Sequence, residues 1–406
     1  MKKDIFWNSI GTAAWSFLSL FLLIVVTRIN GIADSGIFSF AFAFAIIMFT
    51  VGCYGGRAYQ VSDHKNSFTT DDYISLRILT TFGVILLSIL FIIANGYNGQ
   101  KALLILILVG HRVFDALADV FYGILQKKNK LYISGKSLFY KSLLSLSIFY
   151  IVDILTHNLL LSSLTLPLVS LLFIIFYDIP RSKEAEIFNI KPRLRDIKQI
   201  LISTFSPFII AVMGLVFVNL ARYFIDIYHP DLQGYFGIII MPLSMVVLLF
   251  SFISTPALLH LTEQYNIGNF KALNRLVGKI ISLTAVATLL LCVFMYYFGA
   301  WLLELLFNLS FEQYILDVVL VIIIGLAISI TALFTNLAVI ARRLKVTAAI
   351  YLISNVLLIL LCIPLVNHYY IRGAIIAYTV TSCIQAIIMA IYYRRLTSAY
   401  KLSRNS

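Results

Sequence analysis

The sequence predicts an all-α polytopic membrane protein, on the basis of an apolar composition, twelve apolar runs of spanning length, and basic residues confined to alternate connections. Of its 406 residues, 61% are hydrophobic and 12% are charged, whereas soluble domains have about 45–50% and about 25%. The mean hydropathy is +0.96. So little polar surface cannot cover a soluble particle of this length, and a soluble fold is therefore excluded.

A membrane-spanning helix needs about 20 mainly apolar residues, and the sequence contains twelve such runs. The first run follows Lys2 and Lys3 and is expected to be a permanent span rather than a cleaved signal. The weakest break lies around 153–158, between the fifth and sixth runs. The predicted spans are 6–28, 36–56, 75–95, 101–125, 137–156, 158–177, 199–222, 232–259, 277–298, 315–340, 347–366 and 370–393.

The positions of the basic residues predict the orientation of these helices. With a cytoplasmic N-terminus, 26 of the 31 Lys and Arg residues, Arg77 and Lys141 among them, fall in cytoplasmic segments. This agrees with the positive-inside rule and places both termini in the cytoplasm. The formal charge of +13 thus reflects topology, and no basic face or tail indicates nucleic-acid binding.

Short sequence similarities relate the two halves of the chain. Arg28 ends the first span as Arg222 ends the seventh, and basic clusters follow both the fourth and the tenth. Repeats of six spans have the same orientation in the membrane, which is a transporter architecture. The sequence therefore predicts two parallel six-helix bundles in a 6+6 pseudo-repeat, residues 1–177 and 199–406, joined by a cytoplasmic linker at 178–198.

The paired arginines Arg28 and Arg222 leave two interpretations open. Both side chains could extend to the outer headgroups, or both could face a watery cleft between the halves. Polar residues at helical spacing on the first and seventh spans favour the cleft, and Asp226 could hold Arg222 in place. The residues expected to line such a cavity are Asn8, Thr12, Ser16, Ser19 and Asn219.

The fourth span carries His111, Arg112, Asp115 and Asp119 within an apolar run. Ionisable groups at membrane depth cost at least about 2.5–3.5 kcal/mol each and default to functional hypotheses. The two aspartates are either part of an internally neutralised cluster or a site that couples transport to a cation or proton. A metal site at this i, i+4, i+8 spacing would need further ligands nearby, and none is expected.

The second span closes with the glycine-rich segment 52–63, which contains Arg57. Arg57 either anchors the helix end at the inner membrane surface or meets an incoming anion, since its planar fork binds phosphate bidentately. The four cysteines lie in or beside apolar runs, which suggests neither disulfides nor zinc. No catalytic motif is present, so we do not expect an enzyme or an ATP-driven pump.

These residues resemble the polysaccharide flippases, which are the O-antigen and capsule repeat-unit translocases of the multidrug/oligosaccharidyl-lipid/polysaccharide superfamily. The resemblance covers essentially the whole chain, and twelve spans is the family's common number. The segment 57–63 is similar to the form found in capsule and wall-polysaccharide members. The other positions that carry the resemblance are Arg28, Gly36, Gly55, Gly56, Asp115, Gly123, Gln126 and 221–226.

The resemblance implies a V-shaped pair of bundles around a basic central cavity, in the bacterial plasma (inner) membrane. The cargo would be an oligosaccharide linked to undecaprenyl pyrophosphate, moved from the inner to the outer leaflet for cell-surface polysaccharide synthesis. By position, Arg28, Arg57 and Arg222 would bind the pyrophosphate, with Arg112 as a fourth group. Membrane lipids and the polysaccharide polymerase machinery are the implied partners. No cofactor is expected, and coupling to H⁺ or Na⁺ stays open.

Two other functions remain as alternatives. A cation-coupled multidrug-type antiporter of the same superfamily would use acidic cavity residues to bind cations, whereas arginines at these helix ends favour an anionic cargo. A membrane-embedded polysaccharide polymerase or ligase would be expected to have a sizeable outer loop with catalytic groups. The connections in this chain are all short, which argues against such an enzyme.

Overall fold

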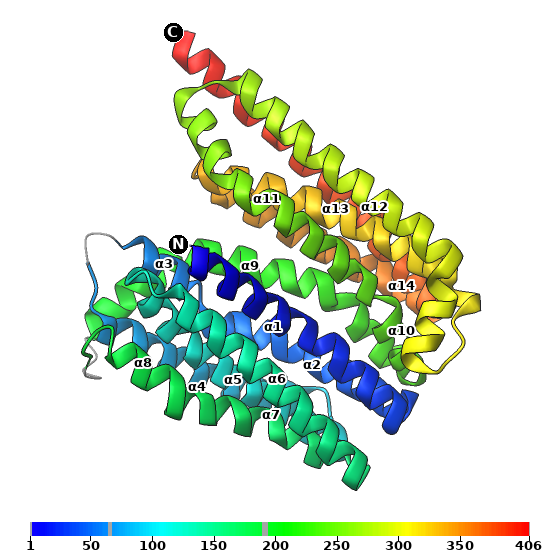
Figure 1. Ribbon diagram of the computed structural model, residues 1–406. Coiled ribbons are helices and arrows are strands. Elements are labelled where there is room, and N and C mark those ends of the chain that lie inside the picture. Colours follow the sequence, from blue (N-terminus) through cyan, green and yellow to red (C-terminus); the bar gives the residue numbers. More distant parts are fainter. Residues whose placement is uncertain (1, 64–66, 189–193, 406) are drawn as a thin grey trace. The chain divides into compact units, whose positions relative to one another are not determined.

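The computed structural model describes residues 2–63, 67–188 and 194–405, which form helices joined by short connections (Figure 1). No strand occurs among these residues, so the predicted all-α fold is confirmed. The chain packs as two compact units, Met1–Leu215 and Val216–Ser406. Part of the predicted linker at 178–198, residues 189–193, lies outside the described residues, and the domain boundary within that linker stays a prediction.

Within the described part of the first unit, nine helical elements precede α9. They are α1 (Lys2–Ile29), α2 (Ile32–Cys53), α3 (Gly56–Ser62), α4 (Thr70–Ala94), α5 (Gly99–Lys127), α6 (Leu131–Thr156), α7 (Leu159–Phe173), the π-helical turn η1 (Ile174–Asp178) and α8 (Ile179–Lys183). The helix α9 (Leu194–Tyr228) begins in the first unit and ends in the second.

The second unit continues with seven further elements among the described residues. They are the 3-10 turn η2 (Pro230–Leu232), α10 (Gln233–Ile239), α11 (Met241–Ile267), α12 (Phe270–Phe307), the 3-10 turn η3 (Glu312–Tyr314), α13 (Ile315–Ile340) and α14 (Leu344–Asn405).

The described residues contain ten helical segments that are long and apolar enough to cross a membrane. Large apolar side chains lie on their outer surfaces; Leu155, Phe176 and Phe82 are 76%, 73% and 69% exposed. Surfaces of this kind are stable against lipid tails rather than water. The chain is therefore a multi-pass membrane protein.

Two further segments bear on the predicted count of twelve spans. The helix α5 is 29 residues long, but its charged residues keep it outside the ten apolar segments. The helix α14 is interrupted at Tyr370, whose φ of 55° and ψ of −132° are not helical. This interruption falls beside the predicted boundary between 347–366 and 370–393. The count of twelve and the orientation of the termini stay predictions.

Local backbone geometry explains two of the predicted helix ends. Tyr54 and Gly55 have φ values of 45° and 66°, which end α2 close to the predicted end of the second span at 56 and start the separate short helix α3, which the sequence did not predict. The weak break at 153–158 is confirmed, because His157 adopts the left-handed conformation and Asn158 caps α7 by accepting the backbone N–H groups of Leu160 and Leu161.

The structure corrects the assignment of two basic residues to cytoplasmic segments. The helix α4 begins at Thr70 and α6 at Leu131, so Arg77 and Lys141 lie inside helices. Their side chains are buried, with 3% and 2% exposure. Neither residue therefore contributes to the positive-inside pattern. Three other residues in that count, Lys65, Lys191 and Arg193, lie outside the described residues.

In the first unit α5 packs against α2, α4, α6 and α7, and α1 lies along α6 (Figure 1). Two glycines bring α1 and α6 together: a Cβ atom on Gly11 would lie 2.1 Å from the backbone oxygen of Gly135. Small residues allow membrane helices to approach this closely, and dispersion contacts then stabilise the pair. The central position of α5 places its charged residues inside the first unit.

In the second unit α13 has the corresponding central position, since it packs against α11, α12 and α14. Its buried polar residues are Asp317 in the first turn and, further along, the hydroxyl residues Ser329 and Thr331, which bond to carbonyl oxygens one turn earlier. The middle of α13 carries no ionisable side chain. The two central helices thus share their position but differ in charge.

Candidate functional site

A cavity of about 240 Å³ lies inside the first unit, beside the charged part of α5. Its wall is formed by α1, α2, α3, α5 and α6. The lining residues are Thr12, Trp15, Phe49, Arg57, Asp115, Asp119, Tyr122, Leu138 and Lys141. Four of these nine side chains are ionisable carboxylates or cations, so the cavity can interact with a charged ligand.

Asp115 is bonded to two cations and an indole. Its Oδ1 accepts from the Nζ of Lys141 at 2.5 Å, and its Oδ2 accepts from Arg112 at 2.7 Å and from the Nε1 of Trp15 at 3.1 Å. All three partners are donors, as an ionised carboxylate requires when it is removed from water. His111 lies 3.8 Å from the same carboxylate.

Arg112 is enclosed rather than exposed to the cavity. Its guanidinium carbon lies 4.9 Å from the ring centroid of Trp15 and 4.7 Å from that of Phe42. The side chain is 2% exposed. The resemblance implied Arg112 as a fourth pyrophosphate ligand. In this structure Arg112 instead bonds to Asp115 and packs against two aromatic rings.

Asp119, one turn further along α5, also bonds to two cations. Its Oδ1 lies 3.3 Å from Arg57 and its Oδ2 lies 3.0 Å from Arg77. Arg57 also donates through two nitrogens to the side-chain oxygen of Gln126, at 3.1 and 3.0 Å. Arg77 donates to the backbone oxygen of Gly52 at 2.9 Å. Of the two interpretations left open for Arg57, an anchor at the membrane surface and a group that meets an anion, the structure places the side chain at the cavity wall.

The local sequence explains this geometry. Asp115 and Asp119 are four residues apart and so lie on one face of α5. The left-handed backbone at Gly55 starts α3 and directs Arg57 toward that face. A Cβ atom at Gly56 would lie 3.2 Å from the guanidinium of Arg77, so a glycine there leaves room for the arginine.

The charge network is defined here as Arg57, Arg77, Arg112, Asp115, Asp119 and Lys141. Its four cations and two carboxylates leave a formal excess of two positive charges. A further carboxylate, Asp178, is buried at the end of η1 and acts electrostatically on Lys141. Even if Asp178 is counted as ionised, the region retains a positive excess.

The predicted polar residues of α1 lie at different depths. Thr12 lines the cavity of the charge network. Asn8 lines a separate cavity of about 740 Å³, together with Asp4, Gln126 and Asn129. Ser16 and Ser19 lie further along α1, where the Ser19 hydroxyl bonds to the Ser16 carbonyl oxygen at 3.4 Å.

Arg28 is exposed at the end of α1. Asn219, Arg222 and Asp226 lie on α9 within the second unit, at the spacing expected for one helix face. Asp226 is buried with 8% exposure. Arg28, on α1, belongs to the first unit but does not line the cavity beside α5.

Sequence reasoning missed Lys141 and Arg77 as members of the site. The missed signal is polar periodicity: Ser134, Ser137, Lys141 and Ser145 recur every three or four residues and are all buried on α6. A lysine at the end of a predicted span satisfies the positive-inside rule. Because that rule already explained Lys141, its place among the inward-facing polar residues of α6 was overlooked.

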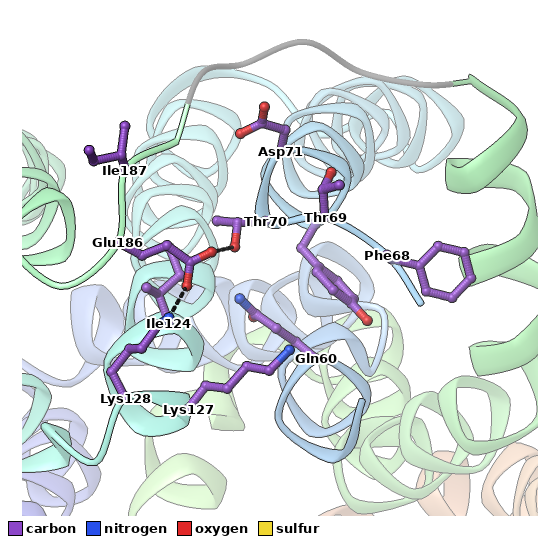
Figure 2. Close-up of a pocket in the computed structure, with 11 residues that line it drawn as sticks. Gln60, Phe68, Thr69, Thr70, Asp71, Ile124, Lys127, Lys128, Glu186 and Ile187 are labelled. Atoms are coloured by element: carbon purple, nitrogen blue, oxygen red, sulfur yellow. Dashed lines mark hydrogen bonds and ion pairs between the residues drawn. The ribbon is translucent and has the colours of Figure 1, made fainter. Parts of the chain in front are cut away.

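A third cavity, of about 560 Å³, lies where α3, α4, α5 and the segment after α8 meet. Figure 2 shows Glu186 bonded to Thr70 and Lys128 at its wall, with Gln60 and Lys127 beside it. Burial alone would raise the pKa of Glu186, but the Thr70 hydroxyl and the Lys128 ammonium lower it, and the net pKa lies below the ordinary value. These bonds hold the segment after α8 against the start of α4 and the end of α5.

Among the described residues, no group of three or more His, Cys, Asp and Glu side chains could hold a metal ion. The carboxylate of Asp115 already has three donors, which leaves it unsuited to the i, i+4, i+8 metal arrangement considered from the sequence.

Comparisons with known proteins extend these observations. No family model matches the chain. The capsular polysaccharide biosynthesis protein CapF of Staphylococcus aureus is 23% identical over 403 residues, which cover 98% of this chain and all of CapF.

Solved structures of transporters share the fold over nearly the whole chain. An inward-facing multidrug resistance MATE family transporter of the MOP superfamily has a TM-score of 0.72 at 15% identity, covering 98% of this chain and 99% of its own. A MOP superfamily transporter from Pyrococcus furiosus, described as having a binding pocket of reverse polarity, has a TM-score of 0.65 at 14% identity, covering 98% and 95%. The chain therefore has the fold of these MOP superfamily transporters, which agrees with the superfamily that its sequence resembles.

Proposed function

We propose that this protein is a flippase that moves an oligosaccharide linked to undecaprenyl pyrophosphate from the inner to the outer leaflet of the bacterial plasma membrane. The observation that carries the proposal is the charge network, whose positive excess borders a cavity inside a membrane-spanning unit. Each of the two phosphates of such a cargo carries an ionised oxygen. A positive cavity therefore compensates the cargo's charge where lipid cannot.

The physical task explains the rest of the architecture. Each sugar hydroxyl moved into hydrocarbon without a partner costs several kcal/mol, so the headgroup needs a polar route while the prenyl tail stays in lipid. We propose twelve spans with both termini cytoplasmic, and alternating exposure of the cavity to the two leaflets. The similarity to MOP transporters named as inward-facing and outward-facing supports this mechanism, and the similarity to CapF supports a capsule-type polysaccharide.

The geometry of the cavity supports an anionic rather than a cationic cargo. A cation-coupled multidrug antiporter would need a carboxylate able to receive a cation, but Asp115 and Asp119 each already bond to two basic side chains. The cavity therefore favours an anion. The solved relatives are transporters rather than enzymes, which supports transport over polymerisation or ligation.

Depletion of the protein in its native bacterium tests the proposal. We expect one lipid-linked oligosaccharide to accumulate on the inner leaflet, where it stays protected from an impermeant oxidant of sugars, while its synthesis continues. Unchanged exposure of every lipid-linked sugar at the outer surface would contradict the proposal.

A further inference from the structure

The feature that carries a further inference is that each of the two aspartates of the charge network, Asp115 and Asp119, pairs with two basic side chains. Asp115 holds Lys141 and Arg112, and Asp119 holds Arg57 and Arg77. In each pair one cation, Lys141 or Arg57, lines the cavity, and the other, Arg112 or Arg77, is not among the lining residues. Lys141 is as deeply buried as Arg112, each with 2% exposure, whereas the Arg57 side chain is 28% exposed. Each carboxylate therefore has an inner partner away from the cavity and an outer partner beside it.

We propose that Asp115 and Asp119 act as internal competitors for the cavity cations, and that the two phosphates of a diphosphate headgroup replace them at Lys141 and Arg57. This inference rests on the proposed function and extends it, because it assigns Lys141 to cargo binding and gives the aspartates a role other than ion coupling.

The geometry supports an exchange of partners. The two aspartates are one turn apart on α5, about 6 Å along the axis, so the two outer cations present neighbouring anion sites. The Nζ of Lys141 lies 5.9 Å from the Tyr122 ring centroid, and the guanidinium carbon of Arg57 lies 5.8 Å from the same centroid. Both cations thus lie beside one aromatic wall of the cavity.

Charge also supports the exchange. When a headgroup phosphate binds Lys141, Asp115 keeps Arg112 and the Trp15 indole as donors. When a phosphate binds Arg57, Asp119 keeps Arg77, and the guanidinium keeps Gln126 as an acceptor. No buried carboxylate is left without a cation, so the step avoids the cost of an uncompensated buried charge. The diphosphate's charge then compensates the positive excess of the network.

An internal competitor has a use in transport. Without Asp115 and Asp119 the four cations would carry a charge of four and would destabilise the empty protein, whereas the two carboxylates reduce this charge to two. The same carboxylates lower the affinity of the cavity for the cargo, and so permit its release at the outer leaflet. The exchange therefore balances stability of the empty protein against retention of the cargo.

The experiment measures binding of inorganic pyrophosphate, in magnesium-free buffer, to the purified full-length chain in phosphatidylcholine nanodiscs. The chain has three tryptophans, so Trp7→Phe and Trp301→Phe leave Trp15 as the only fluorescent indole. Because Trp15 donates to Asp115, its emission reports a rearrangement at that carboxylate. Orthophosphate serves as the comparison ligand, since it has one phosphate instead of two.

We expect Asp115→Asn to tighten pyrophosphate binding by about tenfold, within the usual range of coupling between two sites, and Lys141→Gln to weaken it by a similar factor. Asp119→Asn, at a more exposed position, should tighten binding in the same way. Pyrophosphate should raise the melting temperature of both Asn variants more than that of the parent, because a ligand stabilises the state that binds it best. Structural damage alone would not produce a gain in affinity.

The outcomes separate this inference from the proposed function. If the parent binds pyrophosphate but the Asn variants bind it equally or more weakly, the carboxylates are not competitors, and the inference is wrong while a diphosphate cargo stands. If neither the parent nor any variant binds pyrophosphate, the diphosphate cargo itself is contradicted. The charge-matched control Arg181→Gln removes an exposed cation paired with Glu184 and should leave the affinity unchanged.

Discussion

Arg57 donates to the carboxylate of Asp119 across 3.3 Å, although 62 residues separate them in the chain. The contact joins the short helix α3 to the central helix α5. Because Arg57 is 28% exposed and lines the cavity, the same guanidinium that fixes the helix end is accessible to a ligand.

We predict that Arg57→Lys retains little transport and that Arg57→Ala abolishes it. A lysine ammonium cannot reproduce the fork that holds Gln126 through two nitrogens while contacting Asp119. The measurement is flipping rate at matched amounts of inserted protein. Arg181→Lys is the control, since Arg181 pairs with Glu184 on the surface. If Arg57→Lys and Arg181→Lys lost the same fraction of the flipping rate, the specific role of Arg57 would be contradicted.

Arg28→Ala and Arg222→Ala are predicted to abolish flipping while the protein still inserts and accumulates. Lysine at either position should restore only part of the rate, since a point charge loses bidentate geometry. Full activity of both alanine variants would instead favour the interpretation that these arginines extend to the outer headgroups.

The close approach of α1 and α6 predicts a stability effect. A Cβ atom on Gly135 would lie 2.3 Å from the backbone carbonyl of Trp7, so Gly135→Ala should lower stability by about 1–3 kcal/mol, the usual cost of overpacking. Gly83→Ala is the matched control, because no atom lies within 4 Å of a Cβ there. Thermal unfolding in detergent measures both, and equal melting temperatures would contradict the packing.

The bonds of Glu186 lead us to predict that the docking of the segment after α8 depends on pH. Its pKa is lowered when it bonds to Thr70 and Lys128, so these bonds stabilise the docked segment at neutral pH. The stabilisation is lost as pH falls through that lowered pKa. The protection of the amides in 183–188, measured as the exchange rate relative to the intrinsic rate at the same pH, should therefore fall at acidic pH. In Glu186→Gln the protection should be low at every pH, whereas Glu184→Gln should keep the parent's profile.

The fold was largely predictable because a run of about 20 apolar residues is itself the signal of a span. Helix ends were not, since a helix continues into water after its apolar part stops. The helix α12 shows this, extending over Phe270–Phe307 where 277–298 was predicted. The ionised groups of α5 were found because nothing but function or pairing explains them within an apolar run.

The partners of those groups were harder to predict. Lys141 and Arg77 stand near the starts of their predicted spans, 137–156 and 75–95, where the positive-inside rule already accounts for a basic residue. Only tertiary packing brings Lys141 of α6 and Arg77 of α4 to Asp115 and Asp119. The sequence therefore indicated the two carboxylates of α5, but not the cations of α4 and α6 that bond to them.

The membrane potential is predicted to drive the cycle without an obligatory coupling ion. With the cell interior negative by about 100 mV, moving one negative charge outward gains about 2.3 kcal/mol. If the cavity cations move with the cargo, the potential instead returns the empty, cationic cavity. Collapsing the potential at a constant pH gradient should slow flipping more than collapsing the pH gradient at a constant potential. Strict dependence on H⁺ or Na⁺, lost in Asp115→Asn, would contradict this account.

Flipping in proteoliposomes tests the central claim most directly. The full-length protein is reconstituted with a fluorescent undecaprenyl-pyrophosphate oligosaccharide, and the fraction that becomes accessible to an impermeant quencher is followed over time. We predict exchange far above that of protein-free vesicles, lost in Lys141→Gln and retained in Lys128→Gln, whose lysine pairs with Glu186 outside the charge network. Exchange at the protein-free rate, or equal exchange in the two variants, would contradict the account.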